Sequence, residues 1–135
     1  MNTRVLMTAS AVIMGLTGLT LTFLPGEIAG YYLPHADAAL LLGLQILGAL
    51  YFAFAMLNWM IKGSLIGGIY NRPIAVANFT HFFIGALALL KAYPIGPDPA
   101  NAGLVLAAGY VLFAVLFGLV LFRHPVREPK VKPVQ

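Results

Sequence analysis

The polar side chains of this sequence that could take part in chemistry lie inside long apolar runs. Asn78 and His81 stand three residues apart in the stretch "NRPIAVANFTHFF" (71–83), which opens with Asn71 and Arg72. A spacing of three places both side chains on one face of a helix. An imidazole titrates near neutral pH, and ionisable residues at membrane depth are typical of ligand sites and proton paths.

A structural role for these side chains is the alternative, and it is favoured. Neutral His and Asn side chains hydrogen-bond between membrane helices and fix their register, for about 0.6–2 kcal/mol. No Asp or Glu lies within the apolar runs to pair with His81. The face of Asn78 and His81 continues through Gly85 and Ala88, and we expect it to point toward other helices, because a polar group facing lipid loses its hydrogen bonds.

Two further amides lie in the second apolar run, and with the first group they form a candidate polar pocket. Its members are Asn58, Asn78, His81, Gln45 and Arg72. At about 1.5 Å per helical residue, Asn58, Asn78 and His81 lie roughly 4 to 12 Å inside the ends of their runs.

Hydroxyl groups of the first apolar run reach matching depths. Ser10 and Thr8 are expected partners of the polar residues at comparable depths, Asn58, Asn78 and His81, and Gln45 is level with Thr17 and Thr20. The sequence thus predicts hydrogen bonds between the first run and the second or third run.

The connection "WMIKGSLIGGIYNRP" (59–73) offers a second, weaker candidate. Lys62 together with Gly67 and Gly68 could contact a phosphate or a lipid headgroup, because glycine lets backbone amides approach an anion closely. The stretch lacks the glycine and lysine spacing of a phosphate-binding loop. Trp59 and Tyr70 as interfacial anchors explain the same residues.

Several activities are disfavoured by residues that the sequence does not contain. There are no cysteines, which excludes disulfides and thiolate metal sites. His35 and His124 fall outside the apolar runs and leave His81 alone, so neither a bis-histidine haem nor a metal site is expected. The whole chain is about as long as a small multidrug exporter, but such an exporter carries a Glu in its first membrane helix. The first run of this chain has no Glu. We expect no catalytic residue and no cofactor.

Four apolar runs must position these side chains. They cover residues 5–24, 39–61, 74–90 and 102–122, and none contains Asp, Glu, Lys or Arg. A helix needs roughly 20 mostly apolar residues to span a bilayer, and continuous runs favour helices over the alternating strands of a barrel. The composition, 61% hydrophobic and 9% charged, agrees. The sequence predicts an all-α, polytopic membrane protein with an antiparallel bundle of four transmembrane helices.

Basic residues predict the orientation, since cytoplasmic loops carry the excess of Lys and Arg. The N-terminus, the second connection and the tail would share one side of the membrane. They hold seven of the eight basic residues: Arg4, Lys62, Arg72, Arg123, Arg127, Lys130 and Lys132. Both termini are therefore expected in the cytoplasm, and the net charge of +4 implies no nucleic acid partner. The expected domain covers residues 1–122, followed by a basic, proline-rich tail over 123–135.

Small residues predict how the helices pack. Lipid tails are as apolar as the side chains, so no hydrophobic effect drives helices together, and close approach at small residues favours their association instead. The first and last runs each carry such residues along one face: Ala11, Gly15, Gly18 and Thr22, and Gly103, Ala107, Ala114 and Gly118. These seams favour close helix contacts within the chain or between copies. The connection "PGEIAGYYLPHADA" (25–38) is expected to form a short helical turn at headgroup level.

The segment "ILGALYFAFAMLNWMIKGSLIGGIYNRPIAVANFTHFFIGALALLK" (46–91) resembles small, uncharacterised four-helix membrane proteins of bacteria. In size and layout the whole chain distantly resembles the DoxX-like group of four-helix bundles. The resemblance implies an antiparallel bundle in the bacterial inner membrane and assigns no functional residue.

Three functions are compatible with these features. The first is a non-enzymatic membrane protein that binds an apolar ligand, a lipid or a membrane partner, as a homo-oligomer. The second is a transporter or channel for a small solute, lined by the polar pocket. The third is an enzyme subunit acting on a quinone or lipid beside His81 and Arg72, and it ranks last because one His without an acid is poor acid-base equipment.

Overall fold

The computed structural model describes residues 2–32, 36–64, 71–92 and 102–123, and within them it is helical throughout except for short connections. Four helices are long and apolar enough to cross a membrane: α1 (Thr3–Phe23), α3 (Ala38–Ile61), α4 (Arg72–Ala92) and α5 (Ala102–Arg123). Their bounds lie within two residues of the apolar runs. The prediction of four helices of membrane-spanning length is therefore confirmed.

The chain divides into two compact units, Met1–Ser64 and Leu65–Gln135. The first unit contains α1, α3 and the short helix α2 (Pro25–Tyr32), and the second contains α4 and α5. A single four-helix domain over 1–122 stays a prediction. Beyond Arg123, the basic tail lies outside the described residues.

Side-chain caps determine where the helices of the first unit begin. The Asn2 carboxamide oxygen accepts a hydrogen bond from the backbone N–H of Arg4 at 3.1 Å, and the Asp37 carboxylate accepts one from Leu40 at 2.8 Å. Each cap satisfies an amide that has no partner inside the helix. The connection expected to form a short helical turn forms α2, a helix of eight residues. Pro25 suits its first position, because a first helical residue needs no N–H donor.

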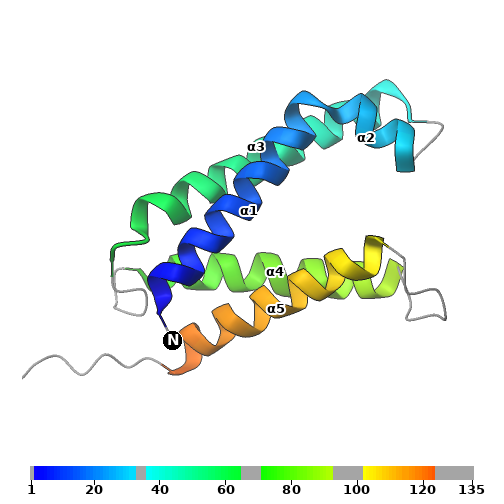
Figure 1. Ribbon diagram of the computed structural model, residues 1–135. Helices are drawn as coiled ribbons and strands as arrows, with labels where there is room; N and C mark the ends of the chain where they lie inside the picture. Colours follow the sequence, from blue (N-terminus) through cyan, green and yellow to red (C-terminus); the bar gives the residue numbers. More distant parts are fainter. Residues whose placement is uncertain (1, 33–35, 65–70, 93–101, 124–135) are drawn as a thin grey trace, which may run out of the picture. The chain divides into compact units, whose positions relative to one another are not determined.

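Helices α1 and α3 lie side by side and run antiparallel, and they pack through backbone contact (Figure 1). A Cβ atom built on Gly18 would lie 2.7 Å from the backbone nitrogen of Phe52 and 2.8 Å from the carbonyl oxygen of Gly48. Gly15 faces Ala55, whose Cβ would be 3.5 Å from the added atom. The small-residue face predicted for the first run is therefore the contact with α3.

Helices α4 and α5 of the second unit are also antiparallel neighbours, and aromatic rings fill the space between them. The ring of Phe82 stacks on Phe113 and Phe117, with centroids 4.8 and 5.8 Å apart, and meets Tyr110 edge-on at 5.4 Å. Pairs at these distances add about 0.5–1.5 kcal/mol beyond the burial of their area. On α4, His81 lies against two members of this cluster, Phe82 and Tyr110.

Candidate functional site

The five residues of the candidate polar pocket belong to different units. Gln45 and Asn58 lie on α3 in the first unit, and Arg72, Asn78 and His81 lie on α4 in the second. The contacts described for each of them fall within its own unit, so a shared pocket stays a prediction.

Asn58 belongs to a buried hydrogen-bonded chain between α3 and α1. Its side-chain nitrogen donates to the Ser10 hydroxyl oxygen at 3.1 Å and lies 3.9 Å from the sulfur of Met14. The Ser10 hydroxyl in turn donates to the carbonyl oxygen of Met7 at 3.0 Å. Asn58 and Ser10 are fully buried. Of the three polar residues expected near Ser10, the structure pairs Asn58 with it, whereas Thr8 donates to the Arg4 carbonyl of its own helix.

The Gln45 side chain hydrogen-bonds to a backbone carbonyl of α1, and not to the threonine hydroxyls expected at its level. Its side-chain nitrogen donates to the Thr22 carbonyl oxygen at 3.4 Å, while the Thr20 hydroxyl donates to Leu16 within α1. Thr22 lies in the last turn of α1, where carbonyl groups have no donor from the helix itself. An exposed glutamine opposite a helix end satisfies such a group.

Asn78 is fully buried, and its side-chain nitrogen donates to the carbonyl oxygen of Ile74 at 3.0 Å. This bond lies within α4, one turn back along the helix. It attaches the amide to its own backbone, the arrangement that short polar side chains adopt in helices.

His81 is half-buried in aromatic surroundings. Its ring lies edge-on to Phe82, with centroids 5.1 Å apart, and is tilted against Tyr110 at 5.6 Å. One turn further along α4, Gly85 leaves the space that the Tyr110 ring occupies, since a Cβ at this position would collide with that ring. The imidazole therefore takes part in aromatic packing between α4 and α5.

The face of α4 that packs in the second unit differs from the expected one. The expected face ran from Asn78 and His81 to Ala88, but Ala88 is exposed. The buried residues of α4 are Ala75, Asn78, Phe82 and Ala86. The centre of the packed face is thus rotated by one residue, from His81 to Phe82, because α4 is apolar all round and its sequence does not mark one side.

A groove between α4 and α5 of the second unit was not predicted by any sequence pattern. It encloses about 510 Å³ and is lined by apolar residues alone: Phe79, Phe83, Ala86, Leu87, Leu90, Val111, Ala114, Val115, Gly118, Leu119 and Phe122. A second depression of about 550 Å³ continues it and shares Leu90, Val111 and Val115. Gly118 faces Phe79, whose ring edge would be 3.2 Å from an added Cβ. The groove offers shape and van der Waals contact, with no hydrogen-bonding side chain.

Lys62, the cation of the weaker candidate for headgroup contact, has a defined position in the first unit. The Lys62 ammonium lies over the ring of Trp59, 2.8 Å from its centroid, a cation–π contact. Gly67 and Gly68, the other members of this candidate, lie outside the described residues. Arg72 is exposed in the first turn of α4.

Metal-ligating side chains do not gather in the described ranges, where no three His, Cys, Asp or Glu residues come close enough to share an ion.

Comparisons with known proteins assign no function to this chain. A scan against protein-family models and searches of the curated proteins and of the solved structures found no match to this chain.

Proposed function

We propose that this protein is a non-enzymatic, multi-pass protein of the bacterial inner membrane that binds an apolar ligand, a lipid acyl chain, in the groove between α4 and α5. Both termini would lie in the cytoplasm. The observation that carries the proposal is the groove itself, whose eleven lining residues are all apolar. A ligand with polar groups would lose hydrogen bonds there without replacement, so the lining selects a hydrocarbon chain.

The dimensions of the groove support this assignment. On α4 its lining extends from Phe79 to Leu90, which is about 16 Å at the helical rise of 1.5 Å per residue. One leaflet makes up about half of the roughly 30 Å hydrocarbon core. The groove thus matches the length of the acyl chains of one leaflet, the apolar molecules always present beside a membrane helix.

A homo-oligomer remains part of the proposal. The glycine face of α1 is occupied by α3, with Gly18 against Phe52. Contacts between copies would therefore use other surfaces, such as the exposed apolar side chains of α3 and α5.

Filling the groove should reduce acyl-chain binding. Gly118→Leu places a branched side chain beside Phe79. Lipid tails are as apolar as the groove, so only packing favours the bound chain. Losing about ten carbon contacts of 0.1–0.2 kcal/mol each removes about 1–2 kcal/mol and weakens binding about fivefold to thirtyfold. The measurement is photo-crosslinking of a phospholipid with a diazirine on its acyl chain, in nanodiscs, with labelled residues located by mass spectrometry.

Gly109→Leu is the matched control, because it adds the same side chain to α5 where nothing lies within 4 Å of the new Cβ. It should leave crosslinking at Leu87 and Val115 unchanged. Equal labelling of these positions in the Gly118→Leu protein would contradict acyl-chain binding in the groove.

A further inference from the structure

The start of α1 and the end of α3 lie at the same end of the first unit (Figure 1). The pairing of Ser10 with Asn58 and of Gly15 with Ala55 establishes the antiparallel register. Continuing that register by one helical turn brings Lys62, which follows α3, opposite the first turns of α1, where Arg4 lies exposed. Two cations of the same unit are thus neighbours.

The electrostatics of this end favour an anion. Shielding from solvent by neighbouring groups, and then repulsion from the Arg4 guanidinium, lower the pKa of Lys62. The only acidic residues within 1–64 are Glu27 and Asp37, which belong to the opposite end of the unit, in α2 and at the start of α3. A bound anion would relieve the repulsion between the two cations. The contact with Trp59 holds the Lys62 ammonium in place at this end.

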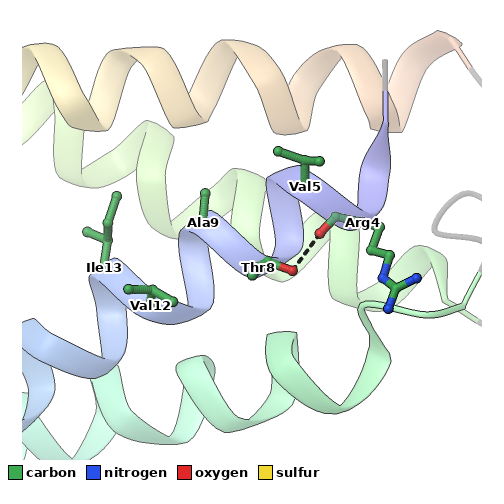
Figure 2. A pocket seen from close by; sticks show the side chains of 6 residues that line it. All are labelled: Arg4, Val5, Thr8, Ala9, Val12 and Ile13. Atoms are coloured by element: carbon green, nitrogen blue, oxygen red, sulfur yellow. Dashed lines mark hydrogen bonds between the residues drawn. The ribbon is translucent and has the colours of Figure 1, made fainter.

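An apolar groove along α1 starts at Arg4 (Figure 2). It encloses about 550 Å³ along α1 and is lined by Arg4, Val5, Thr8, Ala9, Val12 and Ile13. The Thr8 hydroxyl is bonded to the Arg4 carbonyl at 2.8 Å, so beyond Arg4 the lining is effectively apolar. From Arg4 to Ile13 the groove is about 14 Å long at 1.5 Å per residue, close to the depth of one leaflet.

We propose that Arg4 and Lys62 bind the phosphate of an anionic phospholipid, with one of its acyl chains lying in the groove along α1. The two parts of the site match the two parts of such a lipid: charge at the end of the helix and hydrocarbon along it. A lipid with net negative charge is preferred over a zwitterionic one, because the latter brings its own cation beside Arg4 and Lys62. This site lies on the first unit and is separate from the α4–α5 groove.

Trp59 reports directly on this site, since it is the only tryptophan and touches Lys62. In phosphatidylcholine nanodiscs with increasing phosphatidylglycerol, the wild-type fluorescence should change saturably. Each basic residue near an anionic surface contributes about 1 kcal/mol, so Arg4→Gln should shift the midpoint about fivefold toward higher phosphatidylglycerol. Arg4→Gln is the decisive variant, because Lys62→Gln also removes the cation from the tryptophan ring. Native mass spectrometry should show less phosphatidylglycerol retained by both variants.

Lys91→Gln is the control: it removes an exposed cation at the end of α4, in the other unit, and should leave the midpoint unchanged. An Arg4→Gln midpoint equal to that of the wild type, with the helix content preserved by circular dichroism, would overturn the proposal. So would the same Trp59 response to inorganic phosphate in pure phosphatidylcholine nanodiscs, which would assign the site to a soluble anion. Failure of acyl-chain crosslinking at Leu87 and Val115 affects the α4–α5 groove alone.

Discussion

Gly18→Ala is expected to destabilise the first unit more than the same change at Gly15, the other glycine of α1. The new Cβ would lie 2.7 Å from the Phe52 nitrogen and 2.8 Å from the Gly48 oxygen. Both are backbone atoms, which cannot rotate away as a side chain can, so α1 and α3 must separate. Overpacking of this kind costs about 1–3 kcal/mol. Thermal unfolding in mild detergent, followed by circular dichroism, should show a clearly lower midpoint.

Gly43→Ala provides the comparison on α3, since nothing lies within 4 Å of a Cβ at that position. Alanine is the better helix former, by about 1 kcal/mol at an exposed position, so this variant should unfold at the wild-type temperature or slightly above it. Equal midpoints for the Gly18 and Gly43 variants would show that α1 and α3 do not approach at Gly18.

Asn58→Leu is expected to give the second large loss of stability. The substitution keeps a side chain of similar size in a fully buried position but removes the donor to Ser10. Hydrogen bonds between membrane helices contribute about 0.6–2 kcal/mol. A double-mutant cycle with Ser10→Ala should therefore give a coupling of about 1 kcal/mol. The free energies come from reversible unfolding in mixed detergent micelles.

Gln45→Leu is the control amide on the same helix. Its bond to the Thr22 carbonyl is longer, at 3.4 Å, and exposed, so the substitution should change the unfolding free energy by a few tenths of a kcal/mol at about the level of surface substitutions. Additive effects of the Asn58 and Ser10 variants would contradict the coupling between α3 and α1.

The helices of this fold follow from the sequence because bilayer thickness dictates the length of an apolar run. The run over 39–61 predicts α3 to within one residue, and Asp37 at its start supplies the cap. Helix α2 was expected only as a turn. Its eight residues are too few for a periodic pattern, and Pro25 is the one signal for its start.

The contacts between helices were only partly predictable. Depth along antiparallel helices indicated that Ser10 pairs with a polar residue of another helix, but it did not select Asn58 over Asn78 or His81. Depth along the membrane does not determine how a helix is rotated about its axis. The sequence therefore did not predict that Phe82, next to His81, lies at the centre of the contact between α4 and α5. Phe113 and Phe117, one turn apart on α5, were the available signal for the aromatic cluster.

Both proposed lipid sites require that their helices cross the membrane, and the excess of basic residues predicts that the start of α1 and the end of α3 lie on the cytoplasmic side. The chain has no cysteine, so single introduced cysteines report accessibility without background. Ser64→Cys follows α3, Gly26→Cys lies in α2 and Lys91→Cys lies at the end of α4; all three positions are exposed. In intact cells a membrane-impermeant maleimide should label Gly26→Cys and Lys91→Cys, and should label Ser64→Cys only after permeabilisation. Labelling of Ser64→Cys together with Gly26→Cys in intact cells would contradict the four-pass topology.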